Sequence, residues 1–266
     1  MPCCAFGMGA TNLGPGLGWR SGCVAGHNHS RMDISRHLAE GVGGWLMYEW
    51  SANRSGLFNE RYMAVPIANV LHARYAQAVR GEFVHPVLAA EKKGAGRRPE
   101  VDFAVLDDAG LILAVVESKW VGQDGLSADK VIWDLIRLEL IAANANADAY
   151  FLLAGRRKYL ESFFNSRAFK GKEKNGTFRR ILKLGDYRNA SLRIDTPPKD
   201  RVALYRELLQ PYPGVSFTAR LATSRCSVFP ASAPMYQYQA YAWRVHSHES
   251  VPRFKPSTHK YYSGKD

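Results

Sequence analysis

The sequence predicts an α/β protein in which helices flank a mixed sheet. Three observations indicate this class. The longest segments repeat apolar residues at helical spacing, several short runs are apolar and β-branched like buried strands, and turn residues separate these segments. Along residues 57–155 the expected order of elements is α-β-β-β-α-β. Residues 156–266 are expected to extend the same domain as a basic linker and a C-terminal extension.

Three segments before residue 156 are predicted to be helical. Residues 33–50 form the first helix and residues 57–80 the second, with a kink or break at Pro66 because proline cannot continue the helical hydrogen bonding. Ser127 can cap a third helix that runs to about residue 143. The apolar positions of this third helix share one face: Val131, Leu135, Leu138 and Ala142.

Four strands are predicted at residues 83–90, 101–106, 111–116 and 149–154. The sequence Asp107-Asp108-Ala109-Gly110 is a hairpin turn signal, so the second and third strands are expected to pair antiparallel. The third run is apolar throughout, as in a strand that is buried on both faces. Beyond these strands we expect a short helix near 201–209 and two late strands at 215–222 and 238–245.

The composition favours a polyanionic partner and no membrane partner. No apolar run reaches the roughly 18 residues that a membrane span requires. The formal net charge is +12, which favours a polyanion, either nucleic acid or an acidic membrane surface, and of these we expect nucleic acid. Between Arg156 and Arg188 there are eleven Lys and Arg residues but three Asp and Glu residues. This basic stretch is either a solvated loop or a surface that binds phosphates.

Residues 1–31 differ from the rest of the chain. They are rich in Gly, Asn and Ser and show neither apolar periodicity nor a secretory signal. We expect a disordered tail, with order beginning at Met32, a candidate for the true start. Three of the four cysteines lie in this tail, which is not the distribution of a disulfide framework. A reducing, cytoplasmic location is therefore expected.

Three charged side chains are predicted to converge at one end of the hairpin. Asp102 lies on the second strand, while Glu117 and Lys119 end the third and point to the same face because they are two residues apart. Pairing across the turn brings Asp102 opposite Glu117. Charges beside buried strands need a partner, and two carboxylates with the Ser118 carbonyl suit Mg²⁺. A salt bridge between adjacent strands is the alternative.

The segment Pro99-Glu100-Val101-Asp102, followed fifteen positions after Asp102 by Glu117-Ser118-Lys119, resembles the PD-(D/E)XK nuclease superfamily. That superfamily includes type II restriction enzymes, Holliday junction resolvases and repair nucleases. The resemblance covers roughly residues 57–155 and includes the order of the elements. It implies a restriction-endonuclease-like core at residues 32–155 that hydrolyses phosphodiester bonds, in DNA, with Mg²⁺ or Mn²⁺.

The resemblance also implies the role of each motif residue. Asp102, Glu117 and the Ser118 carbonyl would ligate the metal, and Lys119 would act on the attacking water. The Pro-Asp pair of the superfamily reads Pro99-Glu100 here. Glu100 and Asp102 therefore both stay candidates, and Asp102 is favoured because apolar residues flank it.

Further residues are candidates for the same site. Many members of the superfamily carry a glutamate on the helix before the sheet, and Glu60 shares a helical face with apolar residues here, so it is either a metal ligand or a helix-end residue facing solvent. Gln123 could orient Lys119 or a water molecule. The helix after the motif carries three polar residues that either form an ion-pair ladder or border the substrate groove: Lys130, Asp134 and Arg137.

The partners and the main alternative follow from the same residues. The basic residues expected to bind nucleic acid are Arg156, Arg157, Lys158, Arg179 and Arg180. The alternative function is a catalytically silent, nuclease-fold subunit that binds nucleic acid within a larger complex, and a homodimer is also considered. Three late tyrosines could stack on bases but equally suit a core: Tyr236, Tyr238 and Tyr241.

Overall fold

The computed structural model describes residues 33–92, 96–171, 173–174, 177–178, 180–184, 189–225 and 228–263. The chain divides into two units, Met1–Arg31 and Met32–Asp266, and every described residue belongs to the second. The expected disordered tail, all four cysteines and Arg179 lie outside the described residues.

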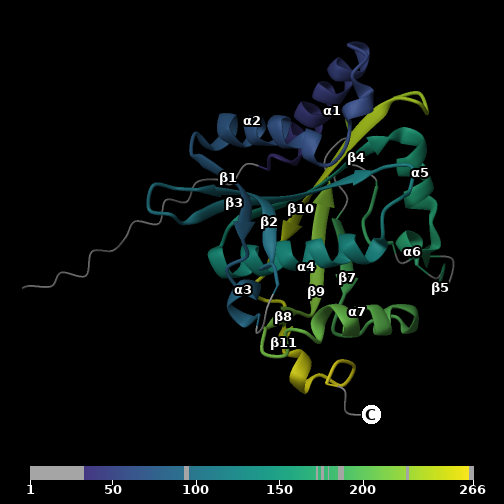
Figure 1. The fold of residues 1–266 in the computed structure, drawn as a ribbon. Coiled ribbons are helices and arrows are strands. Elements are labelled where there is room, and N and C mark those ends of the chain that lie inside the picture. Colours follow the sequence, from purple (N-terminus) through teal and green to yellow (C-terminus); the bar gives the residue numbers. More distant parts are fainter. Residues whose placement is uncertain are drawn as a thin grey trace, which may run out of the picture. The chain divides into compact units, whose positions relative to one another are not determined.

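A seven-stranded sheet crosses the second unit in the order β1-β2-β3-β4-β10-β9-β7 (Figure 1). β3 pairs with β4 in parallel, and the other five neighbouring pairs are antiparallel. The prediction of an α/β class with a mixed sheet is confirmed. The strands span Ala78–Val84 (β1), Glu100–Leu106 (β2), Ile112–Val121 (β3), Asp148–Arg156 (β4), Asn189–Arg193 (β7), Arg220–Arg225 (β9) and Tyr238–His246 (β10).

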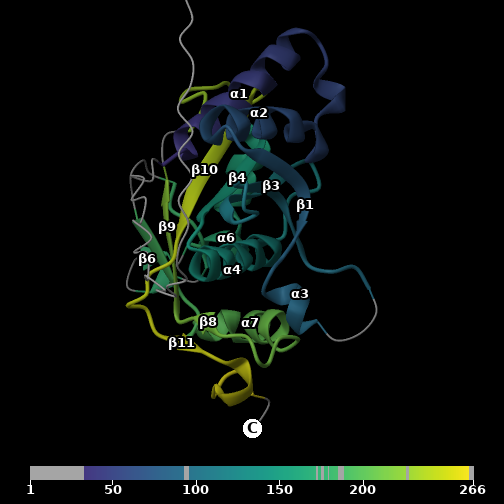
Figure 2. The ribbon, with the colours of Figure 1, turned by 90° about the vertical axis from the view of Figure 1, so that its left-hand side faces the viewer.

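Helices cover both faces of this sheet (Figures 1 and 2). α1 (Ser35–Ser51) and α2 (Ala64–Tyr75) pack on one face. α4 (Ala128–Ala145), α5 (Arg157–Asn165) and α7 (Val202–Leu209) pack on the other. Among the described residues, no helix has the length and apolar character needed to cross a membrane. The short elements are α3 (Leu88–Glu91), α6 (Arg167–Lys170), η1 (Ser55–Leu57), η2 (Arg61–Met63), η3 (Lys199–Arg201), η4 (Pro256–Thr258), β5 (Glu173–Lys174), β6 (Thr177–Phe178), β8 (Phe217–Thr218) and β11 (Arg253–Phe254).

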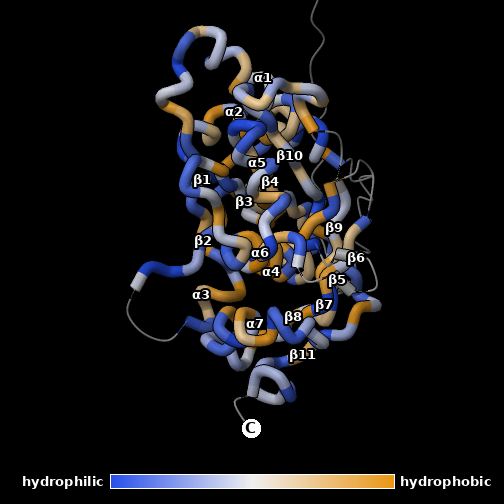
Figure 3. Tube along the Cα trace, turned by 90° about the vertical axis from the view of Figure 1, so that its right-hand side faces the viewer, coloured by the Kyte–Doolittle hydropathy of each residue, from blue (hydrophilic) through white to orange (hydrophobic). Residues whose placement is uncertain are grey.

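The sheet separates two apolar layers, and β4 contributes to both. Tyr150 and Leu152 pack into the layer under α1 and α2, whereas Phe151 and Leu153 pack into the layer under α4. All four are 0% exposed. Because successive strand residues point to opposite faces, a central strand must be apolar throughout, as this one is. Figure 3 shows hydrophobic residues along α4 and the strands that it covers.

The expected second helix and first strand need correction. The second helix begins at Ala64, so Pro66 lies in its first turn and causes no kink, because the first amides of a helix have no helical acceptor to lose. The residues before it form two short 3₁₀ turns. The strand predicted at 83–90 ends at Val84, one residue before His85-Pro86, and a short helix follows. Proline cannot donate to a strand ladder, which explains this end.

The elements that carry the motif are confirmed. The predicted turn joins β2 to β3, and Asp107 Oδ1 accepts hydrogen bonds from the backbone N–H groups of Ala109 and Leu111. Ser127 caps α4 by accepting from Asp129 N at 3.3 Å. α4 then returns the chain to a parallel β4. At the end of this pair a Cβ on Gly155 would lie 2.4 Å from the Val121 carbonyl oxygen, so only glycine fits.

His85 ties α3 to α4. It is 0% exposed, its Nδ1 accepts from Val87 N and Leu88 N, and its Nε2 lies 3.0 Å from the Arg137 carbonyl oxygen. Protonation would convert Nδ1 from an acceptor into a donor, which would then face the two backbone N–H donors of Val87 and Leu88. Burial lowers the pKa of His85 to about 4, and the nearby Arg137 charge acts in the same direction.

This histidine should make the protein less stable in acid. Between pH 6.5 and pH 4 the unfolded chain binds a proton at this position and the folded chain does not, so stability falls as the pH falls, by about 3 kcal/mol in total. His85→Asn keeps an acceptor near the Nδ1 position but cannot titrate. The difference in free energy of unfolding between wild type and this variant should shrink across that window in urea titrations. His72→Asn, at an exposed histidine of α2, is the control. Parallel pH profiles for wild type and His85→Asn would show the prediction wrong.

Candidate active site

Four charged side chains meet between the end of β3 and α4, and we call them the ion-pair cluster. Glu117 pairs with Arg137 Nη2, and Glu117 Oε2 lies 3.7 Å from Lys119 Nζ. Asp134 lies 2.7 Å from Arg137 Nη2 and 3.4 Å from Lys119 Nζ. The side chains of Glu117 and Asp134 are 0% and 4% exposed. Two carboxylates and two cations thus balance one another away from water.

Asp102 lies beside this cluster on β2. The β2–β3 pairing begins at Phe103–Val116, one residue further along. At the preceding position the Asp102 carboxylate binds the neighbouring strand: its Oδ2 accepts from Ser118 N at 2.7 Å and from Ser118 Oγ at 2.9 Å. The charge of Asp102 also acts on the pKa of all four cluster residues. Asp102 therefore belongs to the same site.

Glu60 approaches Lys119 from the loop that precedes α2. It precedes the 3₁₀ turn η2 rather than lying within a helix. Its Oε1 lies 3.3 Å from Lys119 Nζ, and its Oε2 accepts from Trp120 N at 3.4 Å. Its side chain is 44% exposed. The structure thus brings Glu60 to Lys119, although by a turn and not by the expected helical face.

A buried clamp holds the loop that carries Glu60. Glu49, near the end of α1, is 2% exposed. It accepts hydrogen bonds from Arg54 Nε at 2.5 Å, from Arg54 Nη2 at 2.6 Å and from the Tyr62 hydroxyl. Arg54 and Tyr62 lie on either side of Glu60 in the chain, so the Glu49 clamp fixes this loop at both ends.

The environment sets the charge state of the central residues. Burial raises the pKa of Glu117 well above its usual range, Asp134 raises it further, and Arg137 and Lys119 oppose this shift. For Lys119, burial lowers the pKa, but Asp134, Asp102 and Glu117 outweigh burial and the pKa is raised. Lys119 is therefore an ammonium ion at neutral pH. It can donate hydrogen bonds and stabilise negative charge, but it is a poor acceptor of protons.

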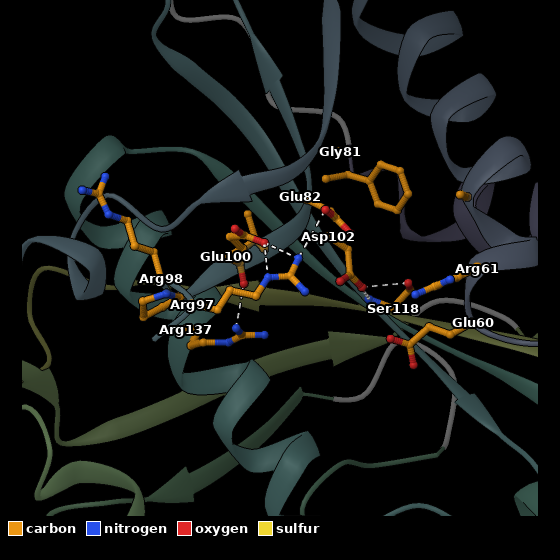
Figure 4. A pocket seen from close by; sticks show the side chains of 14 residues that line it. Glu60, Arg61, Gly81, Glu82, Arg97, Arg98, Glu100, Asp102, Ser118 and Arg137 are labelled. Carbon is orange, nitrogen blue, oxygen red and sulfur yellow. Dashed lines mark hydrogen bonds and ion pairs between the residues drawn. The ribbon is translucent and has the colours of Figure 1, made fainter. Parts of the chain in front are cut away.

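A cavity of about 700 Å³ opens beside the ion-pair cluster (Figure 4). Asp102, Ser118, Glu60 and Arg137 line it, whereas Glu117 and Lys119 lie behind these residues. Three further arginines line it from two sides: Arg61, Arg97 and Arg98. Figure 4 shows Arg61 on the Glu60 side of Asp102 and the other two on the opposite side. The cavity therefore has an acidic wall with cations around it.

The donor atoms at this wall suit a hard divalent cation in kind. Glu117 Oε2 and Asp134 Oδ2 are buried, and neither has a hydrogen-bond partner; the Ser118 carbonyl faces Lys119 Nζ at 2.9 Å. All are oxygen donors, the type that Mg²⁺ prefers. Within the described residues, however, no group of three or more Asp, Glu, His and Cys side chains is arranged to hold a metal ion. The Lys119 ammonium lies among the oxygens instead.

The structure places the other predicted site residues differently. Glu100 lines the cavity, and its carbonyl oxygen accepts from Arg137 Nη1 at 2.7 Å, but its carboxylate accepts from Arg97 Nη2 at 2.6 Å and takes no part in the ion-pair cluster. Asp134 and Arg137 belong to the cluster and not to an exposed ladder. Gln123 and Lys130 are exposed, and neither forms an ion pair or hydrogen bond with the cluster as far as the chain is described.

The predicted nucleic-acid residues do not line the cavity. Arg156 ends β4, where its Nη2 donates to the Tyr238 hydroxyl at 3.3 Å. Arg157 pairs with Glu161 at 2.7 Å, and Lys158 is exposed. Arg180 is half-buried, and Arg179 lies outside the described residues. None of the four described residues of this set appears in the cavity wall.

Sequence reasoning missed three of the cavity arginines, Arg61, Arg97 and Arg98, and the burial of Asp134. Arg97 and Arg98 directly precede Pro99, so their place beside the motif could have been noticed. Asp134 is three residues after Val131 and four before Leu138, which puts it on the apolar stripe of α4. A carboxylate on such a stripe requires a buried cation, and that requirement was the available signal.

Comparisons with known proteins add nothing to this geometry, because no family model, curated protein or solved structure matches the chain.

Removing Arg137 should strongly destabilise the protein. Arg137→Met would leave Glu117 and Asp134 buried with Lys119 as their one remaining cation, at a cost of about 3–5 kcal/mol in the free energy of unfolding measured with urea at pH 7. The destabilisation caused by Arg137→Met should be smaller at lower pH. Burial raises the pKa of Glu117, so this carboxylate is protonated at a higher pH than an ordinary glutamate and then needs no cation. Arg97→Met is the matched control, since Arg97 lines the same cavity but its side chain is 70% exposed, and it should cost less than about 1 kcal/mol. Equal losses for the two variants would contradict a buried charge balance.

Proposed function

We propose that this protein is a Mg²⁺-dependent nuclease with a restriction-endonuclease-like core that hydrolyses phosphodiester bonds, in DNA. The observation that carries the proposal is that Asp102 and Ser118 line a cavity that arginines also line, while Glu117 and Lys119 lie directly behind them. The order α2, β1, β2, β3, α4, β4, interrupted by the four-residue α3, also supports it, since this is the order that the motif resemblance implies.

Each residue has a role that its surroundings support. Asp102, Glu117 and the Ser118 carbonyl would hold Mg²⁺ or Mn²⁺, with Glu60 as a further oxygen donor. A bound ion would polarise the phosphate and acidify a water molecule. Lys119, as an ammonium ion, would orient that water and stabilise the charge that develops on the phosphate. A role for Lys119 as the base is disfavoured by its raised pKa.

The arginines of the cavity would bind the phosphates on either side of the scissile bond. Arg97 already pairs with Glu100 and, at 3.2 Å, with Glu82. Arg61 and Arg98 form no ion pair with any described carboxylate. Both are exposed, so they are available for charge-assisted hydrogen bonds to phosphate.

A catalytically silent, nucleic-acid-binding subunit is the alternative, and one observation favours it. Arg137 lines the cavity and pairs with Glu117, so a cation already neutralises the carboxylate that would bind metal. Isothermal titration calorimetry with Mg²⁺ distinguishes the two functions, because the nuclease should bind Mg²⁺ and the silent subunit should not. Self-association and a cytoplasmic location stay predictions from the sequence.

Replacing Lys119 should stop cleavage without removing DNA binding. Lys119→Met should lower the single-turnover rate by about 10²–10³-fold or more, because a charge that stabilises the transition state is lost. Affinity for DNA should change little, since Lys119 is 13% exposed and does not line the cavity. The assay uses plasmid, linear, branched and single-stranded substrates with Mg²⁺, and EDTA should abolish every reaction.

Two further variants keep this test informative. Lys119→Met combined with Asp134→Asn restores the charge balance of the cluster, so it should fold as the wild type does and still fail to cleave. Lys130→Met removes an exposed lysine of α4 and should cleave normally. Cleavage at the wild-type rate by the double variant would show that the active site is misassigned.

Neutralising Arg61 and Arg98 should weaken DNA binding and its dependence on salt. The combined change to alanine should lower the slope of log affinity against log salt by roughly two for duplex DNA, since each phosphate contact contributes about 0.9. Melting temperature should be unchanged, because neither side chain has an ion pair to lose. Arg36 and Arg193, which are exposed and lie on other elements, supply the control pair. An unaltered slope in Arg61→Ala/Arg98→Ala would rule out phosphate contacts at this cavity.

A further inference from the structure

A row of aromatic side chains lies next to the proposed active site. Successive rings lie within 6.5 Å of one another, measured between centroids: Tyr48 to Trp45 (6.4 Å), Trp45 to Tyr62 (6.5 Å), Tyr62 to Phe58 (5.3 Å) and Phe58 to Trp120 (6.1 Å). We call these five residues the aromatic row. It connects α1 to the end of β3 through the loop before α2.

The aromatic row lies at the margin of the core, where Phe58 and Trp120 pack against it. Tyr48 is 62% exposed, and the other four members are half-buried. Tyr238 is the buried support of the row: it is 4% exposed, and its ring stacks against Trp120 at 5.8 Å. Beside the row, Tyr236 is 57% exposed and contacts Trp50 of α1 at 5.9 Å between centroids. Large aromatic surfaces left partly in water mark interaction sites.

One cation lies over an end of the row and another over its support. Arg54 lies 5.8 Å from the centroid of the Tyr48 ring, and Arg156 lies 5.5 Å from that of Tyr238, which stacks on Trp120. Arg156 forms no ion pair with a described carboxylate, and its buried Nε has no hydrogen-bond partner. The buried indole N–H of Trp45 also has no acceptor, which is unusual for tryptophan. Arg54 is paired with Glu49, so Arg156 is the cation left to bind a ligand. Rings beside such a cation suit a ligand that offers both flat faces and negative charge.

The aromatic row and the cavity meet at Glu60. Trp120 directly follows Lys119, and Trp120 N donates to one oxygen of Glu60 while Lys119 Nζ contacts the other. Phe58 lies two residues before Glu60. The Glu49 clamp holds the loop between them, so the rings are fixed before any ligand arrives. A strand whose phosphate reached the cavity would pass over these rings.

We propose that the aromatic row, together with Tyr236, is a stacking surface for the unpaired bases of a single-stranded nucleic acid. The inference rests on the proposed nuclease function and deepens it by naming the substrate class. Every base has a flat face, so stacking on rings tolerates any sequence, while nearby cations follow the backbone. A duplex hides the faces of its bases and would contact only the cations. A protein partner also uses Tyr, Trp and Arg, but the row starts beside a proposed phosphate site, which favours nucleic acid.

Binding measured without cleavage tests this inference. Fluorescence anisotropy with the full chain in EDTA would compare a labelled oligothymidine of twenty nucleotides with a duplex of equal length. Tyr48→Ala and Tyr236→Ala should each weaken oligothymidine binding by about 5- to 100-fold and leave duplex binding within about twofold. Tyr48→Phe should bind like wild type, because the ring is kept. Tyr261→Ala is the matched control, since Tyr261 is half-buried near η4 and has Lys260 over its ring at 4.9 Å.

The outcomes distinguish this inference from the nuclease proposal. The stacking surface would be overturned if the wild-type protein did not bind oligothymidine. It would also be overturned if the ring variants bound oligothymidine as tightly as the wild type, which is the result expected if the rings bind a protein. Equal losses for single strand and duplex would overturn it too. Binding that depends on the rings, without cleavage of any substrate in Mg²⁺, would refute the nuclease proposal and leave the stacking surface in place.

Discussion

The buried carboxylate of Glu117 is the constraint on which the rest of the site depends. A charge with no exposed surface on a strand must be neutralised nearby, or its burial would oppose folding by several kcal/mol. α4 supplies that neutralisation with Arg137, and Asp134 then requires Lys119 in return. The crossover from β3 to β4 is what lays α4 over the strand, so the parallel pair in this sheet and the ion-pair cluster depend on each other.

Sequence reasoning reached the parts of this arrangement that are local. The apolar run of β3, the Asp107–Gly110 turn and the Ser127 cap each have a short-range signal, and each was found. The convergence of Asp102, Glu117 and Lys119 followed from strand pairing and the two-residue period. Failures came where a tertiary contact decided the structure. β1 ends before Pro86, and the His85 ring then lies against a carbonyl of α4, fifty-two residues away, a partner that no local pattern reports.

The role of individual residues was harder to predict than their position. Strand alternation placed Lys119 beside Glu117, but it could not show that Arg137 would bind the same carboxylate from a helix. Nor could composition reveal which of the thirty-six Lys and Arg residues lie near the cavity. No described residue of the densest basic stretch lines the cavity, whereas the cavity takes its arginines from η2, from the loop before β2 and from α4. Charge density along a chain and charge density in space are different quantities.

The Glu49 clamp has a consequence for how such proteins are recognised. α1 contributes no residue to the cavity, yet its buried carboxylate fixes the loop that presents Glu60 to Lys119. A change at Glu49 would alter the site while every letter of the motif stayed in place. Two chains with identical motif residues can therefore differ in function, because a residue of α1 outside the motif determines where Glu60 lies.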